Sequence, residues 1–312
     1  MTQLAFVFPG QGSQSVGMMN DWGDYQPLVK KTLEQASDAL GENLERIVRE
    51  GPADLLNRTE ITQPAMLAAG IAAWRVWRTA KQPNAVALAG HSLGEYTALV
   101  AAGAMDFGDA LLLVAERGRL MQQAVAEGEG AMAAIIGLDD DRVAEACAAV
   151  GQGVVAPVNY NSPGQVVIAG DRSAVEQAME QAKAMGAKRA LLLPVSVPSH
   201  CSLMKPAADA LYERLKAMDI YMPKVPVIHN QNAAPSTGAD EIRERLRDQL
   251  FQPVRWVECV QALKEQGADT LVELGPGKVL TGLTRRIDKT LAALPVHNAA
   301  SLEAARQQLS GE

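Results

Sequence analysis

Short apolar runs alternate along this chain with longer stretches whose apolar positions recur at helical spacing. Residues 4–8 and 85–89 are typical of buried strands, and each run leads into a glycine-containing turn. Residues 96–103, 109–125 and 203–218 have the three-to-four-residue spacing of amphipathic helices. Because strands and helices alternate in this way, we expect an α/β fold with a largely parallel sheet.

The order of elements changes in the middle of the chain. The pattern predicts strands at 131–136, 154–158, 165–169 and 188–193, with helices at 141–150 and 173–185. This βαββαβ order is typical of a ferredoxin-like unit. We therefore expect a large α/β-hydrolase-like domain made of residues 1–128 and 198–312, and a small ferredoxin-like domain, 129–197, inserted into it. A functional site is expected in the cleft between the two domains.

Composition narrows the class of protein. A chain of 312 residues with 48% hydrophobic and 21% charged residues is an ordinary globular protein, and its net charge of −7 argues against a nucleic-acid partner. The longest apolar stretch, 64–77, contains Arg75 and is too short to span a membrane. The three cysteines have no metal-binding spacing and are not an even set, and no basic segment precedes the first apolar run. These features predict a cytoplasmic protein without a metal site.

The segment Gly90-His-Ser-Leu-Gly94 carries the most specific chemical signal. It has the G-x-S-x-G pattern and lies between an expected strand and an expected helix, which is the context of a nucleophile elbow. An ordinary glycine–serine loop is the simpler alternative. The strand–turn–helix context favours the elbow, so we predict Ser92 as a nucleophile.

A nucleophilic serine needs a base, and the chain has four histidines. His91 adjoins the nucleophile and is expected to order the turn, whereas His229 and His297 are interpreted as surface or satisfied polar residues. His200 follows an apolar strand, 190–197, and precedes the helix at 203–218, so it lies at the crest of a sheet. We therefore predict His200 as the general base that activates Ser92.

No third acid is required by the sequence. The acids between Ser92 and His200 at positions 139–141 and 171 occur at apparent turns and helix starts, where carboxylates act as caps. A backbone carbonyl can also fix the tautomer of a histidine. A serine–histidine pair without an acid is a weaker base, so its substrate should have a good leaving group. A thiol, with a pKa of about 8.5, leaves far more readily than an amine. A thioester substrate is therefore favoured.

Arg117 stands out because its neighbours at helical spacing are all apolar, whereas those of Arg119 are mostly polar. An unpaired cation on an apolar face would be strongly destabilising, so we expect an anionic partner. That partner is either an internal Asp or Glu, or a substrate carboxylate that the guanidinium binds through two N–H groups.

The glycine-rich turn that follows the first strand admits two interpretations. A phosphate loop is disfavoured because Ser15 occupies the place of the third glycine and no Gly-Lys-Ser/Thr follows. In hydrolase-like folds an oxyanion hole uses the N–H after the nucleophile and one from another strand-to-helix loop. Here those groups would be the N–H of Leu93 and the N–H of Gln11.

Together these features resemble the stand-alone malonyl-CoA:acyl carrier protein transacylases of bacterial fatty acid synthesis. The resemblance extends from residue 3 to about residue 287. It rests on FPGQGSQ at 8–14, GHSLGE at 90–95, Arg117, NSPGQ at 161–165, VPSH at 197–200 and ELGPGK at 273–278.

The resemblance implies an acyl-enzyme on Ser92, with His200 as base and Arg117 holding the malonyl carboxylate. It also implies that Gln11 and Leu93 form the oxyanion hole, and that the main-chain carbonyl of Gln249 orients the histidine. His91 and Asn161 are expected to line the pocket. The enzyme would bind no cofactor of its own, since coenzyme A and phosphopantetheine enter as parts of the substrates. Ser199 departs from the aromatic residue found before the histidine in malonyl-type modular polyketide acyltransferases, so acyl selectivity is less firmly implied than the chemistry.

The partners implied are malonyl-CoA and holo acyl carrier protein, which is acidic and needs a basic surface. Lys278, Arg285 and Lys289 fall on one helical face by spacing and are our docking hypothesis, although such clusters are often only solvated. A serine hydrolase or thioesterase, an acyl-binding scaffold without catalysis, and transfer of acetyl or methylmalonyl groups stay open as alternatives.

Overall fold

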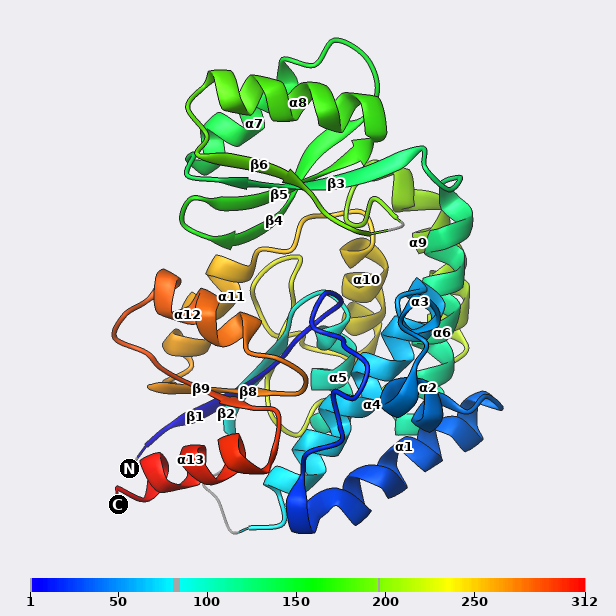
Figure 1. Ribbon diagram of the computed structural model, residues 1–312, viewed down its shortest axis with the longest axis vertical. Coiled ribbons are helices and arrows are strands. Elements are labelled where there is room, and N and C mark those ends of the chain that lie inside the picture. Colours follow the sequence, from blue (N-terminus) through cyan, green and yellow to red (C-terminus); the bar gives the residue numbers. More distant parts are fainter. Residues whose placement is uncertain (1, 81–84, 196, 312) are drawn as a thin grey trace.

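A five-stranded parallel sheet forms the centre of the larger part of the molecule (Figure 1). The computed structural model describes residues 2–80, 85–195 and 197–311; of the expected domains, residues 1, 81–84 and 312 of the large one and Ser196 of the small one lie outside the described residues. All strand pairs in this sheet are parallel, in the order β7-β2-β1-β8-β9. Its strands are β1 (Leu4–Phe8), β2 (Ala85–Gly90), β7 (Val227–Ile228), β8 (Thr270–Leu274) and β9 (Ala292–Val296).

Helices cover both faces of this sheet. Alternate residues of β1 point to opposite sides, because successive side chains of a strand do so. Phe6 and Phe8 join one apolar cluster, and Ala5 and Val7 join another. The first cluster includes residues of α1 (Gln26–Leu40), α2 (Leu44–Glu50), α3 (Ala53–Leu56), α4 (Thr59–Trp77), α5 (Gly94–Ala101), α6 (Phe107–Ala124), α9 (Lys205–Lys216), α10 (Ala239–Gln249) and α13 (Ala299–Ser310), and the second includes residues of α11 (Trp256–Glu265) and α12 (Val279–Ile287).

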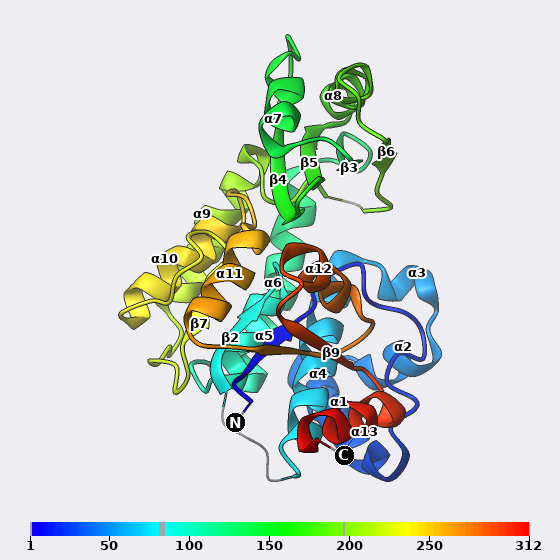
Figure 2. The same cartoon turned by 90° about the vertical axis from the view of Figure 1, so that its left-hand side faces the viewer.

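A second, four-stranded antiparallel sheet follows α6 in the chain (Figure 2). Its strand order is β4-β5-β3-β6, and the helices and strands follow one another as the sequence pattern predicts. Two helices cover one face, where a separate apolar cluster forms, and the other face turns towards the parallel-sheet body. The elements are β3 (Gly130–Ile136), α7 (Asp140–Ala148), β4 (Val155–Ser162), β5 (Gln165–Asp171), α8 (Arg172–Ala184) and β6 (Arg189–Leu192).

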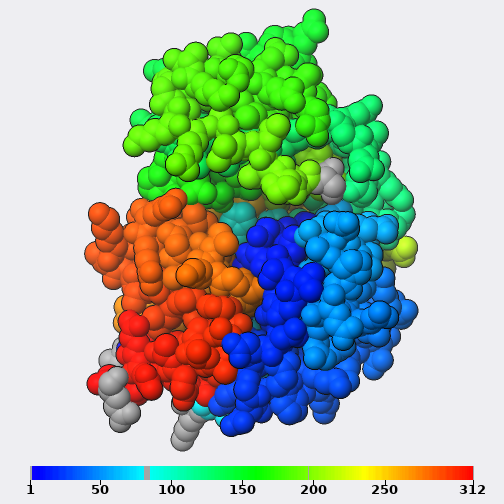
Figure 3. Space-filling view, viewed as in Figure 1, coloured from blue at the N-terminus to red at the C-terminus, as the bar shows by residue number. Residues whose placement is uncertain are grey.

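Backbone hydrogen bonds connect β4 of the antiparallel sheet to the larger part of the molecule. Val254, just before α11, donates its N–H to the carbonyl of Val158 and accepts from the N–H of Tyr160, at 2.8 and 3.0 Å. These bonds tie β4 to the larger part of the molecule. Figure 3 shows the resulting boundary, where the segment after β6 (green) faces the N-terminal turn (dark blue).

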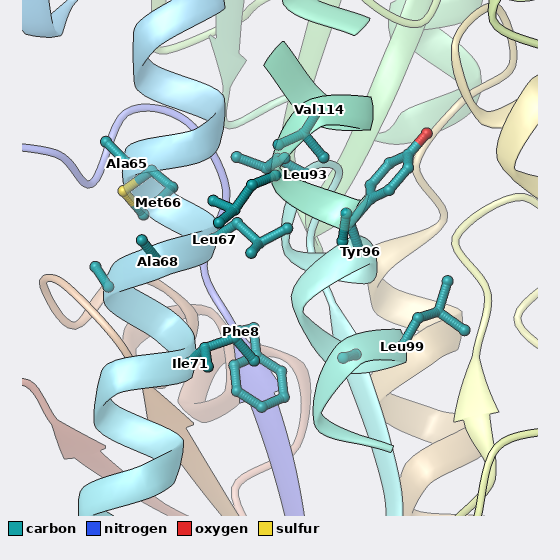
Figure 4. Packing of buried hydrophobic residues seen from close by; sticks show 14 of the residues in the cluster. Phe8, Ala65, Met66, Leu67, Ala68, Ile71, Leu93, Tyr96, Leu99 and Val114 are labelled. Carbon is teal, nitrogen blue, oxygen red and sulfur yellow. The ribbon is translucent and has the colours of Figure 1, made fainter. Parts of the chain in front are cut away.

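Close packing holds the turn after β2 in place (Figure 4). The side chain of Leu93 lies beside Leu67 of α4 and Val114 of α6, and the ring of Tyr96 projects from the other side of α5. All four are buried. Because burial of one such aliphatic side chain stabilises by about 1.5–3 kcal/mol, this contact anchors α5 against both neighbouring helices. The start of α5 therefore has little freedom to move.

Candidate active site

Ser92 lies on a sharp turn between β2 and α5. Its backbone φ is 51°, a left-handed conformation that is strained for a non-glycine residue. The turn closes because two glycines replace bulkier residues: a Cβ on Gly90 would lie 1.9 Å from the Gly94 carbonyl, and one on Gly94 would lie 2.0 Å from the carbonyl oxygen of Phe8. Neither contact is sterically allowed, so the sequence G-x-S-x-G is needed for this geometry.

The structure brings Ser92 and His200 together from positions 108 residues apart. The Oγ of Ser92 lies 2.7 Å from Nε2 of His200, and Nδ1 of His200 lies 2.6 Å from the carbonyl oxygen of Gln249. A carbonyl can only accept, so Nδ1 carries the proton and Nε2 is free to accept from the serine. His200 also has a left-handed φ, 65°. The pair is thus arranged for transfer of the serine proton to the imidazole.

Burial and charge keep this imidazole neutral. His200 is only 3% exposed, and burial followed by the positive charge of Arg117 lowers its pKa to about 3. Both effects penalise the imidazolium form. At neutral pH the ring is therefore in the form that can accept a proton.

Arg117 is fully buried beneath these residues, on α6. Its Nη1 donates to Oε1 of Gln63 at 2.7 Å and its Nη2 donates to Oε1 of Gln249 at 3.0 Å. The guanidinium also lies over the ring of Tyr96, 5.4 Å from its centroid. No acid among the described residues forms an ion pair with Arg117, so the alternative of an internal Asp or Glu partner is wrong. Helical spacing cannot foresee two neutral amides brought in from α4 and α10.

A buried carboxylate lies on the far side of Gln249. Oε2 of Glu95 accepts from Nε2 of Gln249 at 2.9 Å, and its Oε1 accepts from Nδ1 of His229 at 2.7 Å. Asn230 holds the turn directly, because its Oδ1 accepts from the N–H of Ser92 at 2.7 Å. His229 is 1% exposed and hydrogen-bonded at both ring nitrogens, so of the two expectations, a surface or a satisfied polar residue, the second is confirmed.

A cavity of about 420 Å³ opens above Ser92 and His200. One wall comes from the turn after β1, and the opposite wall comes from β3, β4 and the segment after β6. Within the described residues, neither the N–H of Gln11 nor that of Leu93 donates to another protein group. The cavity is lined by Gln11, Gly12, Gln14, Asn57, His91, Ser92, Met132, Asn159, Leu193, Pro194, Val195, Val197, Ser199 and His200.

His91 and Asn161 have different positions relative to this cavity. His91 lines it, and burial lowers the pKa of its imidazole. Asn161 lies behind His91, with its Oδ1 2.8 Å from Nε2 of the ring, and does not line the cavity. The expectation that Asn161 lines the pocket is therefore wrong; Asn159, two positions earlier in β4, lines it instead, in a strand whose pairing with β5 is irregular around both residues.

The basic residues expected to dock a carrier are exposed but do not share one helical face. Helix α12 ends at Ile287, so Lys289 lies in the turn that follows it, and Lys278 precedes the first turn. Only Arg285 belongs to the helix, where its Nη2 donates to the carbonyl of Ala293 at 3.1 Å. The expectation of a shared helical face is wrong because Asp288 ends the helix in an extended conformation.

Several site residues carry no clear sequence signal. Gln63 and Thr59 lie in the long apolar helix α4, and Asn230 follows a two-residue strand. Glu95 directly follows the elbow motif, and its presence on an otherwise apolar helix is the one clue that could have indicated a buried acid. The contacts of all four depend on packing between distant segments.

The described residues include no cluster of metal ligands and no helix that could span a membrane. No group of three or more His, Cys, Asp and Glu side chains there is placed to hold a metal ion. Within the same residues, each helix is too short or too polar to cross a membrane. Cys147, Cys201 and Cys259 are buried free thiols, and burial raises the pKa of Cys201 to about 11.

Comparison with known proteins gives a consistent result. The model of the acyl transferase domain family matches residues 5–309. The chain is 54% identical over 306 residues to a malonyl CoA-acyl carrier protein transacylase of Escherichia coli, covering 98% of this chain and 99% of the relative. Over 315 residues it is 43% identical to the protein of the same name from Bacillus subtilis, covering 100% of this chain and 99% of that one.

Solved structures agree with these relatives. An acyl carrier protein S-malonyltransferase from Vibrio cholerae has a TM-score of 0.94 at 54% identity, covering 97% of this chain and all of that one. A malonyl-transacylase solved in complex with its type II polyketide synthase acyl-carrier protein has a TM-score of 0.96 at 52% identity, with full coverage of both chains.

Proposed function

This chain belongs to the acyl transferase family, and from that premise we infer that it is a malonyl-CoA:acyl carrier protein transacylase of fatty acid biosynthesis. Its substrates are malonyl-CoA and holo acyl carrier protein. One observation of the site carries the malonyl assignment: among the described residues, the side chains that hydrogen-bond the fully buried guanidinium next to the Ser92–His200 pair offer it only neutral oxygens. A carboxylated acyl group supplies the missing anion.

In the first half-reaction, Ser92 is the nucleophile and His200 the base. Nε2 of His200 accepts the serine proton while Oγ attacks the thioester carbonyl, and the C–S bond to coenzyme A then breaks. The imidazolium returns its proton to the departing thiolate. The products are malonyl-Ser92 and free coenzyme A. A thiol leaves readily, so a base supported by the Gln249 carbonyl rather than by an acid is sufficient.

The oxyanion of the tetrahedral intermediate is stabilised by the N–H groups of Gln11 and Leu93. Both are free donors at the carboxyl ends of adjacent strands, β1 and β2. Such a donor contributes on the order of a hundredfold or more to the rate. In the second half-reaction the phosphopantetheine thiol of the carrier takes the place of coenzyme A, gives its proton to His200 and attacks malonyl-Ser92. The ester C–O bond then breaks, the imidazolium returns the proton to Oγ of Ser92, and malonyl-carrier leaves. The chemistry needs no resident cofactor.

The division into domains follows the two sheets. We assign residues 1–128 and 198–312 to an α/β-hydrolase-like domain and 129–197 to a ferredoxin-like insertion, in accord with the strand order of the antiparallel sheet. The nucleophile belongs to the first and part of the cavity wall to the second. Three free cysteines favour a reducing compartment, so we assign the protein to the cytoplasm.

The carrier docks, in this proposal, on the exposed cations Lys278, Arg285 and Lys289. They lie on or beside α12, whose own Arg286 donates to Gln165 of the antiparallel sheet, so the group lies close to the boundary between the two sheets. An acidic carrier requires such a cationic surface on an enzyme of net charge −7.

Intact-mass measurement after brief mixing with malonyl-CoA tests the function. We expect a malonyl adduct on the parent, none on Ser92→Ala, and loss of preference for malonyl over acetyl in Arg117→Ala. The adduct should persist until a thiol is added. Rapid loss of the adduct to water alone would favour a thioesterase, and an equally labelled Ser92→Ala variant would reject the nucleophile.

A further inference from the structure

The guanidinium of Arg117 dictates how two glutamines are oriented. It has N–H donors only, so Gln63 and Gln249 must both turn their amide oxygens towards it. The amide nitrogens then point away. Nε2 of Gln63 faces the hydroxyl of Thr59, 3.2 Å away.

The hydroxyl of Thr59 has a second partner on the opposite side. Nε2 of Gln11 lies 2.9 Å from the same oxygen, so Oγ1 accepts from two amides. Thr59 is 1% exposed and begins α4. A continuous hydrogen-bonded path therefore runs from Gln11 through Thr59 and Gln63 to Arg117.

Tight helix packing brings this path together. A Cβ on Gly118 would lie 2.7 Å from the carbonyl oxygen of Thr59, so the absence of a side chain there lets α6 approach the first turn of α4. Gly118 directly follows Arg117. The arginine and the threonine are thus held at a separation that Gln63 can bridge.

We propose that Thr59 is a positioning residue. It couples Arg117, which binds the substrate carboxylate, to the turn after β1 that contains the oxyanion donor Gln11. Its hydroxyl holds Gln63 in the orientation that Arg117 needs, and holds the side chain of Gln11, whose N–H stabilises the oxyanion. This rests on the roles proposed above for Arg117 and Gln11. The hydrogen bond between Thr59 and Gln63 affects acylation only by acyl groups that carry a carboxylate. The hydrogen bond between Thr59 and Gln11 affects acylation by every acyl group.

A second tether on the same loop provides a matched control. Nε2 of Gln14 donates to Oδ1 of Asn57 at 2.9 Å, and Oε1 of Gln14 accepts from the N–H of Gly12 at 2.7 Å. Asn57 is exposed and makes no contact with Gln63 or Arg117 among the hydrogen bonds of the described residues. Loss of the Asn57 amide removes a hydrogen bond that holds the turn after β1 and leaves the hydrogen bonds of Gln63 and Arg117 in place.

The experiment measures kcat/KM for acylation of Ser92 by malonyl-CoA and by acetyl-CoA in Thr59→Val, Thr59→Ser and Asn57→Ala. We expect Thr59→Val to lower the malonyl-to-acetyl ratio about tenfold, a change typical of one lost hydrogen bond in a charged network. Thr59→Ser keeps the hydroxyl and should stay within about threefold of the parent. Asn57→Ala should lower both activities by a similar factor and leave the ratio unchanged.

A parental ratio in Thr59→Val would overturn the proposal, as would an equal change of ratio in Asn57→Ala. Thermal unfolding is recorded for each protein, and Thr59→Ala, which removes the same hydroxyl, replaces the valine variant if that protein is unfolded. Arg117→Ala separates this idea from the one on which it rests. If Arg117→Ala keeps the malonyl preference, the carboxylate role of Arg117 is wrong; if it loses the preference while Thr59→Val keeps it, only the coupling is wrong.

Discussion

The main-chain carbonyl oxygen of Gln249 lies 2.6 Å from Nδ1 of His200, in the place where many serine enzymes have a carboxylate. A carbonyl fixes the tautomer of the ring but brings no full negative charge to stabilise an imidazolium. The same glutamine binds Arg117 through its side chain, so one residue orients the base and the arginine proposed to hold the acyl carboxylate. Selectivity and catalysis therefore depend on a shared residue.

The pH dependence of acylation should reflect the lowered pKa of His200. Burial, with the charge of Arg117, moves that pKa from 6.5 to about 3, so the reactive neutral form persists as the pH falls through 6.5. With acetyl-CoA, whose acyl group has no carboxylate, kcat/KM should not fall between pH 8 and about pH 5. Arg117→Gln removes a neighbouring positive charge, which favours the imidazolium, so the acid limb should shift to higher pH. Coincident limbs in parent and variant would contradict this account.

Replacing Gln63 with glutamate supplies the internal acid that Arg117 lacks. The carboxylate would form a buried ion pair with the guanidinium and compete with the malonyl carboxylate. We expect kcat/KM for malonyl-CoA to fall about tenfold or more, with a much smaller change for acetyl-CoA. Stopped-flow acylation with both thioesters measures this, and an equal loss for the two would show that the change acts on the fold and not on carboxylate binding.

The elbow should not tolerate a methyl group at Gly94. The added Cβ would lie 2.0 Å from the carbonyl oxygen of Phe8, so Gly94→Ala should destabilise by about 3 kcal/mol or prevent folding. Gly282, exposed in α12 with open space around it, is the matched control. Gly282→Ala should stabilise by about 0.5–1 kcal/mol, because alanine favours a helix. Urea unfolding distinguishes the two, and similar midpoints would refute the steric argument.

Charge reversal at Arg285 and Lys289 tests the carrier surface. The double change to glutamate should lower kcat/KM for the holo carrier about tenfold or more at low salt and leave acylation by malonyl-CoA intact. Lys30→Glu, which reverses a charge on exposed helix α1, is the control and should leave carrier kinetics unchanged. Unaltered carrier kinetics in the double variant would remove this surface from consideration.

Much of the molecule could be predicted from local patterns. The first strand, the elbow and the βαββαβ segment follow from short-range periodicity and from glycine positions, and their observed bounds differ by only a few residues. Ser92 and His200 could be proposed because each lies in a turn directly after an apolar run. The end of α12 could not, because the chain there keeps basic residues at helical spacing beyond Ile287.

The surroundings of Arg117 show why the other contacts of the site could not be predicted from the sequence. Helical spacing indicated a buried cation and predicted an anionic partner, but the side chains that bind it, Gln63 and Gln249, are neutral and lie 54 and 132 residues away in sequence. Amides in such positions look like ordinary helix residues, and only the crossing of α4, α6 and α10 gives them a role. The contact between Asn161 and His91, 70 residues apart in sequence, likewise depends on packing between distant segments.

The neutrality of the two side chains hydrogen-bonded to Arg117 has a thermodynamic consequence for the resting protein. A buried cation without a directly bound counter-ion is a standing liability, and its Nε lacks any partner among the described residues. Selection for thermal robustness alone would replace such an arginine with an aliphatic residue. Because the arginine is retained, the free protein is less stable than the same fold with an aliphatic residue there. Binding of a dicarboxylic half-thioester should raise the stability by supplying the counter-ion.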